Sequence, residues 1–383
     1  MRPTALKLTA GVLFICGLFP AAKAQVDEIN VVTTAVPFLR ISPDARAGGM
    51  GDLGVATSPD ASAGFWNIGK VAFNESKGGI AATYTPWLKE LVNDVYLASL
   101  SGYYKFADDQ AISATLRYFS LGNIQFTDQN GNLNGNGKPR EFGIDVGYSR
   151  KLTDKFGLGV TVRYINSDLA SGAPSGGNTY KVGTSVAGDI GLYYDAKNQS
   201  GDGFTFGATL TNLGAKIAYT DNADQKDFIP ANFALGTTWN KSFDEQNKIT
   251  FGIDFNKLLV PTLKGTTAQD IEDYRKKGLV SSWFGSFSDF PGQASVSVGA
   301  EYWYNNQFAL RGGYFWEDKS RGNRRYFTAG LGLKYNIFGL NFSYLAPSGS
   351  GVSRNPLSNT LRFSVLFDLD GGSGEAATTT DSN

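Results

Sequence analysis

Charged residues of alternating sign stand in one stretch that is rich in glycine and proline, residues 38–52 (FLRISPDARAGGMGD). They are Arg40, Asp44, Arg46 and Asp52. The same stretch contains Pro43, Gly48, Gly49 and Gly51. Proline lacks a backbone N–H, and glycine adopts backbone angles that other residues avoid, so this stretch is neither a regular helix nor a regular strand. The chemistry that it offers is ion pairing. It is either a linker or an irregular segment folded into something larger.

Catalytic chemistry has little support elsewhere. The chain has no histidine, and its single cysteine is Cys16. This excludes Ser–His and Cys–His catalysis and any metal site with a histidine ligand. We therefore expect no catalytic residue, no metal and no cofactor. Lys plus Arg equals Asp plus Glu, 35 each, so the charge balance does not indicate a nucleic-acid partner.

The first 24 residues have the pattern of a secretory signal peptide. Arg2 and Lys7 precede an apolar run, residues 8–19, which is followed by AAKA. The run is too short to span a bilayer as a helix. Cleavage after Ala24 removes Cys16, and an exported chain without cysteine has no disulfides, so backbone hydrogen bonds and packing must hold its fold.

Beyond residue 78 the sequence alternates with a period of two, which indicates β-strands. In residues 249–256, for example, Ile249, Phe251, Ile253 and Phe255 alternate with polar residues and glycine. Most segments are longer than strands of soluble proteins and fit tilted strands that cross an outer membrane. Fourteen segments show the pattern: 79–86, 92–106, 110–121, 140–151, 155–168, 179–195, 203–213, 230–241, 247–258, 293–304, 307–318, 325–336, 338–346 and 357–369.

The connections between these segments divide into two classes. Those after even-numbered segments are short, and those after odd-numbered segments are mostly long, up to residues 259–292. This asymmetry is typical of outer-membrane barrels and less so of a soluble β-sandwich or propeller, the alternative that we weighed. We predict an all-β fold, a 14-stranded transmembrane outer-membrane β-barrel over residues 78–370. Its long loops would be extracellular, both termini would be periplasmic, and residues 371–383 would form a disordered tail.

The predicted lumen is lined by glycine, serine, threonine and charges of both signs. Fourteen strands enclose a space too wide for side chains alone to fill. Residues 25–77 are the available material, so we expect an N-terminal plug segment in the lumen. The charged residues of 38–52 could then pair with charges on the barrel wall.

Four aromatic residues in the longest predicted loop form a candidate partner-binding site: Trp283, Phe284, Phe287 and Phe290. Exposed aromatic residues in an outer loop are typical of protein interfaces. The alternative is that they fold back over the barrel mouth or lie in the membrane interface.

Residues 38–73, FLRISPDARAGGMGDLGVATSPDASAGFWNIGKVAF, followed by fourteen barrel segments, closely resemble the PorV (LptO) family of the type IX secretion system of Bacteroidetes, within the FadL-like barrels. Where that group usually has Asn-Pro-Ala, this chain has Asn67, Ile68 and Gly69. The resemblance implies a non-enzymatic outer-membrane protein. Such proteins bind the C-terminal signal domain of cargo leaving a Sov/SprA-like translocon, cover the translocon's lateral opening, and pass cargo to a PorU-like sortase. Besides these protein partners, outer-membrane lipid is expected.

Two other functions are alternatives to this one. A FadL-type transporter of hydrophobic small molecules would need an apolar pocket near the plug and an opening in the wall, whereas the predicted inward face is mostly small, polar or charged. An outer-membrane esterase or deacylase would need a Ser–His–Asp arrangement or similar, which a chain without histidine does not have.

Overall fold

The computed structural model describes residues 34–87, 94–127, 130–170, 174–175, 178–221, 225–261, 263, 265, 267–289, 294–317, 324–348 and 359–369. The expected signal peptide, the first residues of the expected plug and the expected tail lie outside the described residues.

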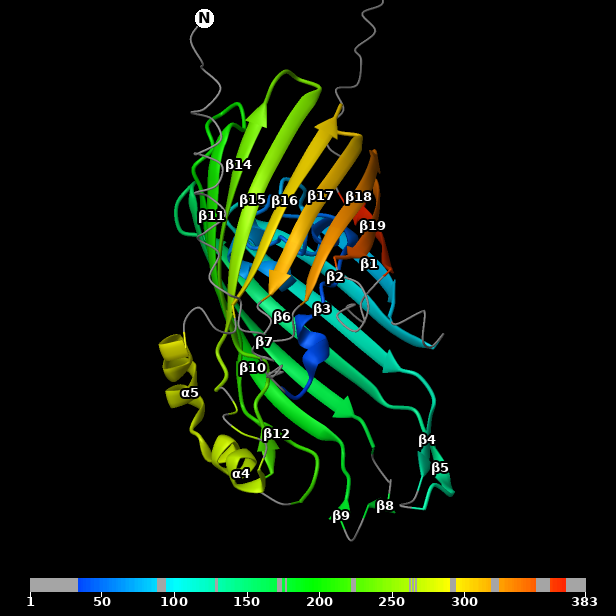
Figure 1. Cartoon of the computed structure of the whole chain (residues 1–383). Helices are drawn as coiled ribbons and strands as arrows, with labels where there is room; N and C mark the ends of the chain where they lie inside the picture. The colour runs from blue at the N-terminus through cyan, green and yellow to red at the C-terminus, as the bar shows by residue number, and fades with distance from the viewer. Residues whose placement is uncertain are drawn as a thin grey trace, which may run out of the picture.

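Fourteen antiparallel strands form one closed barrel, as predicted (Figure 1). The barrel closes where β1 pairs with β20, for example Ala82 with Val365. Closure satisfies the backbone donors and acceptors of both terminal strands, which an open sheet edge in lipid would leave unpaired. In barrel order the strands are β1 (Gly78–Pro86), β2 (Val95–Ala107), β3 (Gln110–Leu121), β6 (Arg140–Lys151), β7 (Phe156–Asp168), β10 (Gly183–Asp195), β11 (Gly203–Gly214), β14 (Asn232–Ser242), β15 (Asn247–Leu258), β16 (Ala294–Tyr304), β17 (Phe308–Glu317), β18 (Arg325–Tyr335), β19 (Phe338–Pro347) and β20 (Thr360–Asp368).

The period-two pattern separates an apolar outer face from a polar inner face. On β7, Val162 is 63% exposed on the outside, and the next residue, Arg163, is 2% exposed inside. The same alternation runs along most strands. An outer wall this apolar is unfavourable in water and suits contact with lipid. Among the described residues, no helix is both long enough and apolar enough to span a bilayer.

The two rims differ in the way that the sequence predicts. At one rim, short turns join the strands, and the turn between β16 and β17 uses Asn305 and Asn306 with φ of 53° and 50°, a backbone region that asparagine tolerates. At the other rim, the long connections carry elements of their own (Figure 1). These are β4 (Ile124–Thr127) with β5 (Leu133–Gly137), β8 (Pro174–Ser175) with β9 (Asn178–Thr179), β12 (Ile217–Ala218) with β13 (Lys226–Asp227), and α4 (Ala268–Lys276), α5 (Leu279–Gly285) and η3 (Ser286–Asp289) between β15 and β16.

The described part of the segment before the barrel, residues 34–77, packs against the inner face. It forms four short helices: η1 (Pro37–Arg40), α2 (Ala45–Gly48), α3 (Ala63–Trp66) and η2 (Ile68–Phe73). An apolar cluster at each end fixes it to the wall. Phe38 and Leu39 join Leu97 and Ile165 near the long-loop rim, and Ile68 and Val71 belong to a cluster near the short-turn rim.

The segment before the barrel therefore runs along the length of the lumen. The N–H of Ala35 donates to the carbonyl of Phe228 in a long loop, at 2.9 Å, so the first described residues lie at the long-loop end. The strands β1 and β20 do begin and end at the short-turn rim, where Gly79 pairs with Asp368. An even number of strands places the two ends of the barrel at the same rim. The prediction that both termini are periplasmic concerns residues outside the described ranges, so it stays a prediction.

Candidate functional site

Arg46 forms the most extensive contact between the segment and the wall. Its Nε and Nη2 donate to the two carboxylate oxygens of Glu301 on β16, at 2.9 and 2.8 Å. Its Nη1 donates to Asp60 at 3.0 Å. Glu301 also accepts from Arg311 of β17, at 2.6 Å. A bidentate guanidinium–carboxylate pair that is largely shielded from water is among the stronger polar contacts in proteins, so it holds α2 against the wall.

Asp52 makes the second contact. Its carboxylate accepts from Arg362 of β20 at 2.9 Å and from the hydroxyl of Tyr326 on β18 at 2.6 Å. The preceding residue, Gly51, has a φ of 73°, and a Cβ there would lie 2.8 Å from the backbone nitrogen of Tyr314. Only glycine fits this close approach, which brings Asp52 to its partners.

Arg40 reaches the wall at the long-loop end. Its Nη2 donates to Glu317 at 3.2 Å. Glu317, the last residue of β17, already accepts two bonds of 2.7 Å from Arg324.

Asp44 is the one of the four charged residues that stays within the segment. It caps α2 by accepting from the N–H of Ala47 at 2.8 Å, and it accepts from the indole N–H of Trp66 at 2.6 Å. Burial raises the pKa of the Asp44 carboxyl above its ordinary value, and the nearby carboxylate of Asp60 raises it further. The role of Asp44 is local: it joins α2 to α3.

The remaining predicted residues of this stretch, Pro43, Gly48 and Gly49, are buried and carry no polar side chain. Pro43 is buried at the start of α2. A Cβ on Gly48 would lie 2.3 Å from Nη1 of Arg362, and one on Gly49 would lie 3.0 Å from the Cα of Gly330. Both glycines thus allow the segment to approach β18 and β20 closely.

A second set of contacts, which sequence reasoning missed, centres on Gly54. Its N–H donates to Asp254 on β15 at 2.7 Å, and its carbonyl accepts from the ammonium of Lys70 at 2.6 Å. A Cβ on Gly54 would lie 2.1 Å from the ring of Trp66. No spacing in the sequence marks these residues, because they meet only in the folded lumen.

Lys70 is buried beside this peptide group. Its ammonium also donates to the carbonyl and hydroxyl of Thr57, at 3.1 and 3.0 Å. Burial lowers the pKa of Lys70 to about 8. The three acceptors compensate in part for removing the charge from water.

Asn67 occupies the first position of the motif that departs from the family pattern. Its amide donates to the carbonyls of Val55 and Leu192, and its oxygen accepts from the N–H of Gly69. Asn67 thus caps the start of η2.

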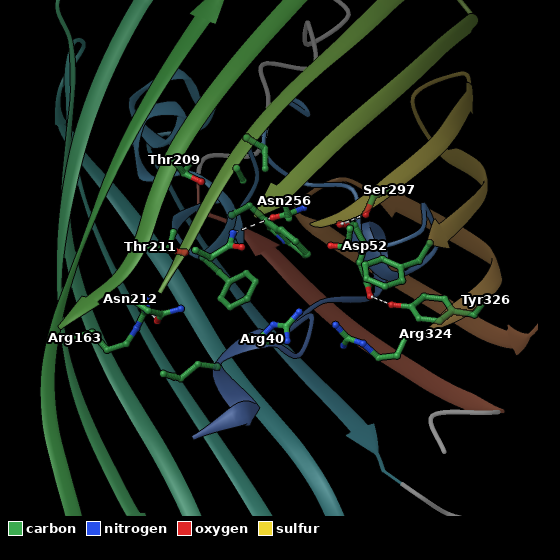
Figure 2. Close-up of a pocket in the computed structure, with 18 residues that line it drawn as sticks. Arg40, Asp52, Arg163, Thr209, Thr211, Asn212, Asn256, Ser297, Arg324 and Tyr326 are labelled. Carbon is green, nitrogen blue, oxygen red and sulfur yellow. Dashed lines mark hydrogen bonds between the residues drawn. The ribbon is translucent and has the colours of Figure 1, made fainter. Parts of the chain in front are cut away.

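A cavity of about 110 Å³ lies between the segment and the wall, towards the long-loop end (Figure 2). The segment contributes Leu39, Arg40, Asp52, Val55, Phe65 and Trp66. The wall contributes mainly hydroxyl, amide and guanidinium groups, including Thr211, Asn256, Ser295, Arg163 and Arg324. The lining is therefore mixed: its guanidinium, amide and hydroxyl groups can bind polar or anionic groups, and Leu39, Phe65 and Phe315 add apolar surface.

The helix α5, which carries Trp283 and Phe284, lies at the long-loop end, to one side of the barrel (Figure 1). Phe284 on α5 is 74% exposed, and Trp283 is half-buried. The ring of Phe287 packs edge-on against Phe233, which points outward from β14, with 5.9 Å between centroids. Phe290 lies outside the described residues. Phe287 thus lies against the outer face of β14.

The base of this loop is well anchored. Tyr274 of α4 packs with Phe228 and Leu258 in a buried cluster. Lys216 donates to the carbonyls of Arg275 and Lys277, both at 2.6 Å. A Thr267–Asp270 capping box begins α4. These contacts present α5 on a fixed support.

An apolar depression of about 530 Å³ lies on the outer wall over β10, β11, β14 and β15. Leu192, Phe206, Leu235 and Ile253 are among its lining residues. Behind it, Val55 of the segment lies against the inner face, since a Cβ on Gly236 would be 2.8 Å from the Cβ of Val55. Within the described ranges, no group of three or more acidic, cysteine or histidine residues could hold a metal ion.

One family model matches residues 23–265, and its description is "Type IX secretion system protein PorV". The match covers the whole described segment and the barrel as far as β15, and it ends before α5. No curated protein sequence matches the chain significantly.

Solved structures share the barrel fold at low sequence identity. The toluene transporter TbuX of Ralstonia pickettii superposes with a TM-score of 0.54 at 12% identity, over 85% of this chain and 97% of that one. The monoaromatic hydrocarbon channel CymD gives 0.51 at 11% identity, over 85% and 95%. A FadL homologue from Pseudomonas aeruginosa gives 0.47 at 11% identity, over 86% and 99%. At these identities the likeness shows the fold alone.

Proposed function

Because the chain belongs to the PorV family of type IX secretion system proteins, whose model matches residues 23–265, we propose that it works as a non-enzymatic cargo carrier of that system. In this role it binds the C-terminal signal domain of exported proteins as they leave a Sov/SprA-like translocon. It covers the translocon's lateral opening and delivers cargo to a PorU-like sortase complex. The family match is the observation that carries this proposal.

The geometry agrees with this role in two respects. The described segment packs inside the barrel. This agrees with a carrier whose cargo does not pass through its own lumen. The outer wall and the supported helix α5 at the long-loop rim offer surfaces to proteins beside the barrel. We assign the long loops to the cell exterior and the short turns to the periplasm.

A native pull-down tests the proposal. The full chain, tagged within the tail and purified from outer membranes in mild detergent, should co-purify with a much larger barrel protein. It should also recover exported proteins that share a C-terminal domain. Another abundant outer-membrane barrel carrying the same tag serves as the control for non-specific recovery. Recovery of the chain alone, or of the same proteins with both baits, contradicts the proposal.

A FadL-type transporter of hydrophobic small molecules is the second candidate, and the apolar depression in the outer wall favours it. A pathway from that depression into the lumen would need Val55 to move away from Gly207 and Gly236. The lumen cavity has guanidinium, amide and hydroxyl groups among its lining residues, so it suits an apolar molecule less well than a purely apolar pocket would. Purified protein that carries a bound apolar molecule and no protein partner would support the transporter over the carrier.

A further inference from the structure

Two guanidinium groups share one carboxylate at the long-loop end of the lumen. Arg324 binds Glu317 in a bidentate way, with one hydrogen bond of 2.7 Å to each carboxylate oxygen. Arg40 adds a single N–H at 3.2 Å to one of the same oxygens. One negative charge therefore faces two positive charges. Burial lowers the pKa of Arg40, and the neighbouring charge of Arg324 lowers it further.

The other charges that line the cavity are balanced by described partners. Asp52 pairs with Arg362. Arg163 pairs with Asp145 and Asp189, and Asp145 also accepts from Arg117, so that group has two charges of each sign. Within the described part of the chain, Arg40 is thus the surplus cation at the cavity, and its side chain is 28% exposed.

The space beside Arg40 offers donors. Figure 2 shows the guanidinium groups of Arg40 and Arg324 pointing towards one another across the cavity, with Asn256 on the wall above them. The amide oxygen of Asn256 accepts from Asn232 at 3.1 Å, and among the described residues its N–H groups have no acceptor. Ser295 and Thr211 add hydroxyl groups to the same lining. The only carboxylate in that lining, Asp52, is already paired.

We propose that this cavity is a binding site for a small oxyanion, a carboxylate or a phosphate, held by Arg40 and Arg324 with Asn256 and Ser295 as further donors. A volume of about 110 Å³ accommodates one such group. The oxyanion adds a second negative charge beside two arginines that otherwise share the single charge of Glu317. It comes either from a free anion or from the anionic substituent of a sugar, and the polar lining suits both. The site does not depend on the proposed carrier function.

Isothermal titration of the full chain in detergent micelles, at fixed ionic strength, tests the site with four probes: inorganic phosphate, acetate, glucose 6-phosphate and glucose. Saturable binding of phosphate or acetate is expected. Arg40→Gln should weaken it by about tenfold or more, because a charge-assisted hydrogen bond is lost. Arg40→Lys should keep part of it, because the charge remains without the planar fork. Arg150→Gln, which removes a rim arginine paired with Asp109, should bind as the unaltered chain does.

The outcomes separate cleanly. Glucose 6-phosphate that binds more tightly than phosphate indicates a sugar-borne anion, and equal binding indicates a free anion. Heat-dependent gel mobility confirms that each variant is folded. No saturable binding of any oxyanion overturns the proposal. Binding unchanged in Arg40→Gln, or glucose that binds as well as its phosphate, overturns it as well.

Discussion

Single atoms decide how the segment before the barrel is held, and Gly54 is the clearest case. Its N–H donates to Asp254, its carbonyl accepts from Lys70, and the ring of Trp66 covers its Cα. A methyl group has no room there. Gly54→Ala should therefore destabilise the packed segment by about 1–3 kcal/mol, the usual cost of overpacking.

Conductance in planar bilayers would show the effect of Gly54→Ala as more frequent open events. The same substitution at Gly285, where a Cβ would meet nothing within 4 Å, is the matched control and should behave as the unaltered chain does. Equal traces for Gly54→Ala and Gly285→Ala would mean that the contact with Trp66 does not hold the segment.

Lys70 makes the stability of the packed segment depend on pH. Its pKa is about 8 in the folded lumen, against an ordinary value of 10.5. Between these values the released segment binds a proton that the packed segment does not, so raising the pH favours packing. Open events should therefore become rarer from pH 8 to pH 10.5. Lys70→Met should remove this trend, and a trend that persists in that variant would assign it to another group.

At the scale of elements, the segment itself can be removed. Deleting residues 25–52 takes away the pairs that Arg46 and Asp52 make with the wall, and a 14-stranded lumen is too wide for its own side chains to close. Single-channel conductance should rise. Deleting residues 371–383 removes sequence of no predicted role in the lumen and should change nothing. A conductance unaltered by the first deletion would show that the segment does not obstruct the lumen.

The helix α5 is the second element with a separable role. Phe284→Ser replaces a side chain that is 74% exposed, so the free energy of unfolding should change by no more than about 0.5 kcal/mol. Recovery of partners in the pull-down should fall nonetheless. Phe243→Ser, at an exposed aromatic of the short-turn rim, is the matched control.

Deleting residues 282–290 should lower partner recovery further while the barrel still folds. Full recovery with this deletion would remove α5 and η3 from the candidate partner surface.

At the scale of the whole molecule, closure depends on β20, which pairs with β19 on one side and β1 on the other. Leu366→Pro introduces proline within that strand, where it removes a backbone N–H from the hydrogen-bond ladder of a strand that is paired on both sides. The compact, heat-sensitive band on an SDS gel should disappear. Ala376→Pro, in the tail, should leave that band intact. A compact band in Leu366→Pro would mean that β20 is not needed for closure.

The sequence predicts most of the barrel because its signal is local. Alternation within each strand and the contrast between short and long connections mark all fourteen strands. The contacts of the segment are not local. Arg46 and Glu301 are 255 residues apart in sequence, and Asp52 and Arg362 are 310 apart. Sequence pattern predicted that such charges could pair, but the choice of partner depends on the fold. The bond of Asp44 with Trp66, 22 residues away, was not predicted for the same reason.

The course of the segment has a mechanical consequence. It is covalently joined to the barrel only at Gly78, on the short-turn rim, while Ala35 is held by a hydrogen bond at the opposite end. Tension applied near Ala35 would break the contacts between the segment and the wall one after another, from Ala35 towards β1. The strands of the barrel would not bear this force. The released stretch would remain tethered, with a reach on the order of 150 Å for the residues from 34 to 77 when fully extended. A pull of this kind could therefore be reversed, because the segment cannot diffuse away from the lumen that it left.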